Sequence, residues 1–224
     1  RDIVRPLPVK ITISGSAIAS GGSAAPVTAT ALEEAIQKAA TAGLVALQAD
    51  SAKTLLALSS EQLAKISDTG KPLAVTVQGV QFILSPDSLK VPELTAANAA
   101  QLQLSARKLS AEDVQGLVAT LKGQYRFAGD VYELDLAVVD KEGKHQSITQ
   151  LPDCRVSLPV PEAAREAAAV GRVKACRYNE ESKMWEEVGG AYDPAVGVIS
   201  IKVDHFSKYA LLETVSFKHN AGHW

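Results

Sequence analysis

The feature that most constrains the fold is an alternation of apolar and polar residues in the second half of the chain. Residues 131–140 (VYELDLAVVD), 173–178 (VKACRY) and 198–203 (VISIKV) follow this two-residue period, which buries one face of a β-strand and exposes the other. Glycine, asparagine and proline separate these runs at short intervals, as at Gly189-Gly190. Many short strands joined by tight turns are typical of an antiparallel sandwich, which the pattern predicts over residues 111–215.

The first half mixes helical and strand signals. Apolar residues at helical spacing follow residues that favour N-caps, and a glycine ends each of the first two runs. Short strands lie between the helices, and Gly79 divides residues 73–84 into a hairpin. We therefore expect an α+β region over residues 1–110, the mainly antiparallel β-sandwich over 111–215, and a tail over 216–224. The predicted caps and stops are Thr28 or Thr30 with Gly43, Ser59 or Ser60 with Gly70, and Ser110 for a third helix.

Composition excludes some partners. Twenty-three basic and 25 acidic residues give a net charge of -2, so no basic field would attract nucleic acid. Polar or charged residues interrupt every apolar run before the roughly 18–20 residues of a membrane span, which predicts that this chain does not cross a bilayer. Only 5% of the residues are aromatic, which disfavours a pocket lined with rings.

The two cysteines, Cys154 and Cys176, lie in stretches that read as strands. Neighbouring strands bring side chains within disulfide reach, so the pair is a disulfide candidate. The alternative is that each thiol is a small buried apolar group. Neither cysteine has a histidine at zinc-ligand spacing, and His219 and His223 belong to the polar tail, so we predict no metal site.

Four stretches carry a family resemblance: VYELDLAVVDKEGKHQSITQL (residues 131–151), SLPVP (157–161), RYNEESKMWEEVGG (177–190) and YDPAVGVISIKVDHFSKYALLE (192–213). Together they resemble a β module of the large cell-surface proteins of Gram-positive bacteria that carry S-layer homology domains. The upstream runs TALEEAIQKAATAGL and LSSEQLAKISDTGKPLAVTVQGVQFILSPDSL resemble the repeat region that often precedes that module. The resemblance implies an extracellular module at the cell surface, whose partners are cell-wall polysaccharide or neighbouring surface-protein domains.

One tripeptide suggests chemistry. In His205-Phe206-Ser207, a histidine acting as general base would let the serine hydroxyl attack the preceding carbonyl, converting the peptide to an ester that water cuts between Phe206 and Ser207. The motif resembles the self-cleavage site of the autoproteolytic nucleoporin and of certain death-domain receptor modules. The reaction also needs a strained peptide and an oxyanion donor. The favoured interpretation is a strand entry in which Phe206 packs inward and His205 and Ser207 make turn hydrogen bonds.

A second candidate is aromatic. Trp185 with Tyr178 and Tyr192 would form an exposed platform on which a sugar ring stacks, as in glycan-binding modules. The alternation of residues around Trp185 (KMWEEV) instead favours a place in the sandwich core. Asp130, Asp135, Asp140 and Asp193 fall near turns, but the sequence has no calcium-loop motif.

The sequence therefore predicts a protein without enzymatic activity and without cofactors. No phosphate-binding loop, dinucleotide fingerprint or nucleophile elbow occurs, and adjacent acidic pairs point in different directions rather than converging on one bond. We expect a structural, spacer or assembly module of a secreted bacterial surface protein. The alternatives left open are a carbohydrate- or protein-binding adhesin module and a self-cleaving domain.

Overall fold

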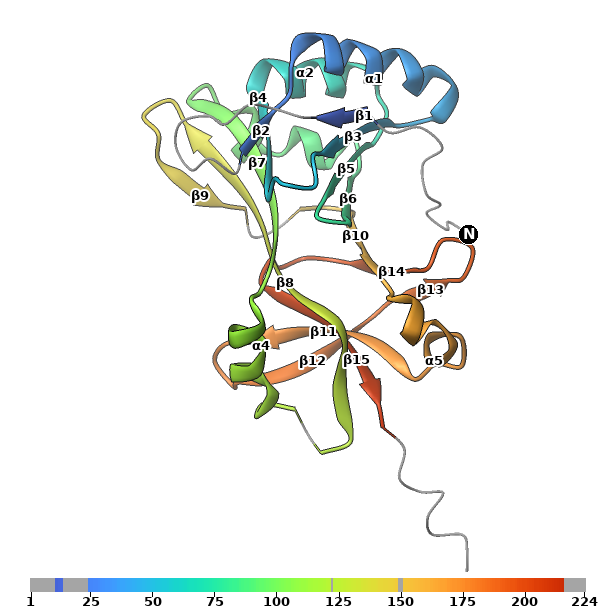
Figure 1. The fold of residues 1–224 in the computed structure, drawn as a ribbon. Helices are drawn as coiled ribbons and strands as arrows, with labels where there is room; N and C mark the ends of the chain where they lie inside the picture. The colour runs from blue at the N-terminus through green and yellow to red at the C-terminus, as the bar shows by residue number, and fades with distance from the viewer. Residues whose placement is uncertain (1–10, 14–23, 122, 149–150, 216–224) are drawn as a thin grey trace, which may run out of the picture. The chain divides into compact units, whose positions relative to one another are not determined.

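Strand is the main secondary structure of the chain. The computed structural model describes residues 11–13, 24–121, 123–148 and 151–215. Its strands form two sheets, and each sheet contains both parallel and antiparallel pairs (Figure 1). The predicted β-rich fold is confirmed at this level. The predicted tail at 216–224, with His219 and His223, lies outside the described residues.

The chain divides into two compact units, each built from several segments. Unit 1 takes residues 1–107, 134–157 and 202–206, and unit 2 takes residues 108–133, 158–201 and 207–224. The backbone therefore passes between the units five times. Four of these passages lie inside single strands: β7 (Ala99–Lys108), β8 (Tyr125–Asp140), β10 (Cys154–Pro159) and β14 (Val198–Lys202). The predicted boundaries near residues 110 and 215 stay a prediction.

In unit 1, two helices precede strands that pair in parallel. Helix α1 (Ala29–Ala42) is capped by Thr28 and ends at Gly43, and α2 (Ser60–Asp68) begins with a capping box between Ser59 and Gln62. Both predicted helices are confirmed. Helix α1 lies against β1 (Ile11–Ile13) and β3 (Val45–Ala49), and α2 lies against β4 (Leu55–Ser59) (Figure 1). Parallel pairing joins β1 to β3, β3 to β5 (Leu73–Val77), and β2 (Ala24–Pro26) to β4.

The predicted hairpin around Gly79 is confirmed. Strands β5 and β6 (Val80–Leu84) pair antiparallel across Gln78 and Gly79, which have φ values of 54° and 81°. Two consecutive residues at positive φ are the signature of the tight turn that matches strand twist. Strand β6 then pairs with the start of β10, and β4 pairs with β7 (Ala99–Lys108). Short helices η1 (Ser88–Lys90) and α3 (Pro92–Thr95) precede β7, and β9 (His145–Ser147) pairs with β8.

Unit 2 contains four antiparallel strands in the order β12, β11, β15 and β8. These are β11 (Val173–Asn179), β12 (Met184–Gly189), β15 (Lys208–Thr214) and the first part of β8. The short hairpin of β13 (Ala191–Asp193) and β14 (Val198–Lys202) also belongs here. Helix α4 (Ala111–Val118) is capped by Ser110 as predicted, and η2 (Glu162–Ala164) continues into α5 (Arg165–Ala169).

Each unit has a core of its own. In unit 1, Phe82 and a set of leucines are fully buried. In unit 2, Leu109, Val131 and Ala210 form a cluster against which Val114 and Leu117 of α4 pack. Burial of each large apolar side chain contributes about 1.5–3 kcal/mol, so these contacts supply the main stabilising term. None of the described helices has the length and apolar character needed to cross a membrane.

The disulfide candidate is wrong: Cys154 and Cys176 are both free. Strand β10 lies beside β6 and β14 in one sheet, whereas β11 lies between β12 and β15 in the other, so the strands that carry the two thiols are not neighbours. Both thiols are buried, as the alternative interpretation held. Burial, together with the charge of Asp153, raises the pKa of Cys154 to about 12, and burial beside Glu187 does the same for Cys176.

Candidate functional site

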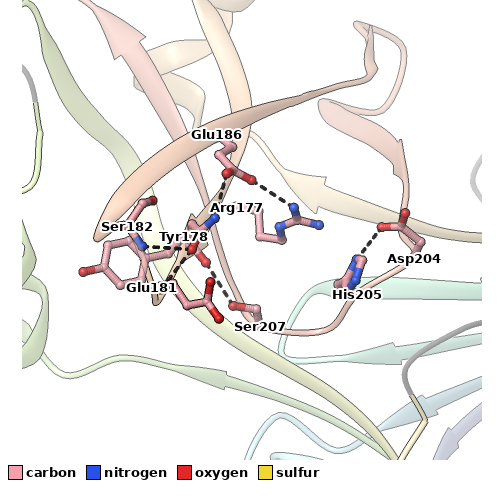
Figure 2. A network of polar contacts seen from close by, with 9 residues as sticks. Arg177, Tyr178, Glu181, Ser182, Glu186, Asp204, His205 and Ser207 are labelled. Carbon is pink, nitrogen blue, oxygen red and sulfur yellow. Dashed lines mark hydrogen bonds and ion pairs between the residues drawn. The ribbon is translucent and has the colours of Figure 1, made fainter.

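The residues of the tripeptide His205-Phe206-Ser207 each have a partner elsewhere. The imidazole Nδ1 of His205 lies 2.9 Å from the carboxylate of Asp204 (Figure 2). The Phe206 ring lies 6.4 Å from the ring of Phe82. The Ser207 hydroxyl donates to the backbone carbonyl of Tyr178 at 3.3 Å. The Phe206 ring meets another aromatic ring, as the favoured interpretation expected, whereas the Ser207 hydrogen bond reaches strand β11 instead of closing a turn.

Backbone strain in the described residues is found away from this tripeptide. The non-glycine residues at positive φ are Gln78, Asp153 and Lys183. An ester-forming attack needs a bent scissile peptide and a free serine hydroxyl proton aimed at the histidine. The Ser207 proton points instead at a carbonyl. Self-cleavage stays a hypothesis.

The structure brings two of the three predicted aromatic residues, Trp185 and Tyr178, into contact. The rings of Trp185 and Tyr178 lie 5.2 Å apart, and Phe127 meets Trp185 edge to face at 5.5 Å. Tyr178 is only 6% exposed and has the Lys208 ammonium 5.8 Å from its ring centre. Tyr192 lies on β13, opposite Ile199, in the other sheet. The three predicted residues therefore form no common platform, and Phe127 is the partner that the sequence pattern did not indicate.

Trp185 is held in a fixed orientation. Its indole Nε1 donates to the Thr120 hydroxyl at 2.9 Å, and that hydroxyl donates in turn to the backbone carbonyl of Leu117. The indole is therefore tied to the C-terminal end of α4 as well as to two other rings. Aromatic pairs of this kind contribute about 0.5–1.5 kcal/mol beyond the apolar area that they bury.

A cavity of about 180 Å³ lies beside Trp185, within unit 2. The residues just after α4 and the start of β8 form one wall, and strands β11, β12 and β15 form the floor. Helix α4 is short. Eight residues span about 12 Å of helix, whereas a seven-residue strand spans about 23 Å, so the helix covers only part of the sheet face. Its floor includes Lys174, Cys176, Glu187, Leu212 and Thr214.

A polar network fixes the hairpin that carries Trp185 (Figure 2). Arg177 donates to the Glu186 carboxylate at 2.9 Å, and the Asn179 amide donates to its other oxygen at 2.8 Å. The Asn179 oxygen accepts from the backbone amides of Glu181 and Ser182, which closes the turn. Hydrogen bonds from Asn179 and then Arg177 hold the pKa of Glu186 below its usual 4.5. The network positions the two strands that frame the cavity.

Two of the aspartates near turns, Asp140 and Asp193, accept hydrogen bonds from backbone amides. One Asp140 oxygen accepts from the amides of Glu142 and Lys144, and one Asp193 oxygen accepts from Ala195. Asp135 accepts from the Ser147 hydroxyl. Over the described ranges, no three histidine, cysteine or acidic side chains are grouped as a metal site would require. The cavity itself is lined by an indole, apolar side chains, hydroxyls, a thiol and one charged pair.

Comparison of the chain with known protein families and with curated proteins found no match.

Proposed function

We propose that this chain is a non-enzymatic structural module, a spacer or assembly unit of a secreted bacterial cell-surface protein. The observation that carries the proposal is the bonding of β15, the last described strand. It pairs antiparallel with β11 on one side and with β8 on the other. Tension applied to the C-terminal end of such a strand loads two ladders of backbone hydrogen bonds together, so many bonds must break at once.

An ionic contact between a buried carboxylate and two exposed arginines lies at the C-terminal end of this strand. Glu213 is only 8% exposed and accepts from Arg126 at 3.3 Å and from Arg172 at 3.4 Å. Arg126 stands directly across from Glu213 on β8, and Arg172 immediately precedes β11. One carboxylate therefore joins the C-terminal end of β15 to both neighbouring segments. We call this contact the Glu213 clamp.

The arrangement of strand pairs supports the same proposal. The parallel pairs and the helices α1 and α2 all lie before residue 78, whereas the later strands described above pair antiparallel. In this proposal the chain is an α+β N-terminal region followed by a mainly antiparallel β-sandwich, as expected for the resembled surface module. Five passages of the backbone between the units also mean that neither unit is a single continuous segment.

Single-molecule stretching tests the proposal. The chain is held by both termini and extended, and we expect a distinct unfolding event for the wild type. Glu213→Gln removes the charge of the clamp and lowers the unfolding force. Glu187→Gln, which removes a charge from an exposed pair between β11 and β12, is the matched control and leaves the force unchanged. Extension without a distinct event, or equal forces for wild type and Glu213→Gln, would contradict the spacer role.

A further inference from the structure

We propose that the cavity beside Trp185 binds a single neutral sugar ring. This site would add recognition to the structural role, and it does not depend on that role. The inference rests on three properties of the cavity: its division into an apolar and a polar side, the fixed orientation of its indole, and its size and charge.

The cavity lining has an apolar part and a polar part, as a sugar ring does. A pyranose ring presents C–H groups on its faces and hydroxyl groups around its edge. Leu121, Met184 and the Trp185 indole offer apolar surface, while Lys174 and Glu187 offer hydrogen-bond groups of both kinds. An ammonium donates three hydrogen bonds and a carboxylate accepts several, so together they can satisfy neighbouring hydroxyls.

These residues face the same space because of strand geometry. Side chains two positions apart on a strand point to the same side. Lys174 and Cys176 are so related on β11, as are Trp185 and Glu187 on β12. Residues of both strands line the cavity. The hairpin of β11 and β12 therefore places the Trp185 ring and the Lys174–Glu187 pair in the lining of one cavity.

The indole is preorganised. The hydrogen bond to Thr120 and the contacts with Phe127 and Tyr178 fix it before any ligand arrives. A ring already held in place loses little conformational freedom on binding, which favours affinity in a small site. Met184, which is 44% exposed, adds flexible apolar surface to the lining.

The size and the charge of the cavity limit the class of ligand that it can bind. The volume of about 180 Å³ is below the ~300 Å³ at which sites for drug-sized molecules begin, so it suits one ring. Lys174 and Glu187 lie 3.8 Å apart and cancel in charge, which favours a neutral ligand over an anionic one. The Cys176 thiol on the floor stays protonated, because burial and Glu187 raise its pKa to about 12. The floor therefore offers a neutral surface and no covalent chemistry.

Nuclear magnetic resonance of the full chain tests the site. The probes are the methyl glycosides of glucose and of N-acetylglucosamine, with cyclohexanol as an apolar ring of similar size. The chain has two tryptophans, and Trp224→Phe assigns the indole N–H signal of Trp185. We expect at least one glycoside to shift that signal and the amide signals of Lys174 and Glu187. A ligand of about a dozen non-hydrogen atoms is expected to bind with a dissociation constant on the order of 1 mM.

Variants separate binding from folding. Trp185→Ala removes contacts with two other rings, so the informative change is Glu187→Gln, which keeps shape at an exposed position and weakens binding about fivefold. Glu180→Gln is the matched control: Glu180 is also exposed and pairs with a lysine, Lys208, but does not line the cavity, and affinity stays within about twofold.

Three outcomes would overturn the proposal. These are no shift of the Trp185 signal with either glycoside, binding of cyclohexanol as tight as that of the sugars, and equal effects of Glu187→Gln and Glu180→Gln. Retention of the chain on wall polysaccharide without these shifts would place binding elsewhere on the molecule and would also reject this site. None of these results bears on the stretching experiment.

Discussion

Adding one methyl group at Gly190 is expected to destabilise unit 2 strongly, whereas the same change at the adjacent Gly189 is not. Both glycines have positive φ, 80° at Gly189 and 113° at Gly190, where an L side chain is strained. Their surroundings differ. A Cβ at Gly189 meets no atom within 4 Å, but a Cβ at Gly190 would lie 2.6 Å from the Ile201 Cγ2 and 2.8 Å from the Ser200 backbone oxygen.

The change in the free energy of unfolding has two contributions, backbone strain at positive φ and overlap of the new methyl group with nearby atoms. Backbone strain from positive φ is about 1–2 kcal/mol, and the lower freedom of the unfolded alanine chain offsets about 0.4–1 kcal/mol of it. Gly189→Ala is therefore expected to lower the free energy of unfolding by about 0–1.6 kcal/mol. Gly190→Ala adds an overpacking term of about 1–3 kcal/mol, because the Ser200 oxygen belongs to a paired strand and cannot move away freely. The expected difference between the two variants is about 2 kcal/mol.

Guanidinium unfolding followed by circular dichroism measures this difference. The two variants carry the same change at neighbouring positions in one turn, so strain from φ and the effect on the unfolded chain largely cancel between them. Equal midpoints for Gly189→Ala and Gly190→Ala, at equal slopes, would show that β14 does not approach Gly190 as described.

Three further outcomes are expected. Cys154 and Cys176 should resist a thiol reagent at pH 8 in the folded protein, because pKa values of about 12 leave only about one thiol in ten thousand ionised, and both should react once the chain is unfolded. The lowered pKa of Glu186 stabilises the fold above the usual pKa of 4.5, and this contribution is lost as the pH falls through the folded value, so Glu186→Gln should flatten the acid limb of the stability profile. The chain should remain a single band on denaturing electrophoresis after long incubation; a fragment ending at Phe206, abolished by Ser207→Ala, would contradict the hydrogen bonding of that serine.

The elements that the sequence predicted well are those whose signals are local. The N-caps Thr28, Ser59 and Ser110 each accept a hydrogen bond from a residue three positions on, and the turn at Gly79 needs only its own backbone. A pattern of four or five residues contains that information. The parallel pairing of β1, β3 and β5 was not predicted, because the choice of partner strand depends on residues far apart in the chain.

The start of strand β8 also depends on a contact between residues far apart in the chain, which local alternation does not reveal. Alternation predicted a strand from Val131, but the strand begins at Tyr125. Gly129 interrupts the pattern, and in the structure a Cβ there would lie 2.8 Å from the ring of Pro161. Position 129 therefore requires glycine because of Pro161, 32 positions away. From the sequence alone, a glycine inside a strand instead indicates that the strand is weak. The environment of Trp185 has a similar origin: Thr120 and Phe127 are remote in sequence, so alternation alone favoured a core residue and could not indicate a cavity.

The structural role and the sugar site are separable because they use opposite sides of β15. Leu212 and Thr214 line the cavity, and Glu213 between them forms the clamp with Arg126 and Arg172. Successive side chains of a strand point to opposite faces, so a ligand in the cavity and the clamp do not share atoms. Glu213→Gln should therefore lower the unfolding force without changing sugar affinity, and Glu187→Gln should do the reverse. If either variant altered both properties, the two faces of β15 would be coupled through the strand itself, and the assignment of separate roles would have to be abandoned.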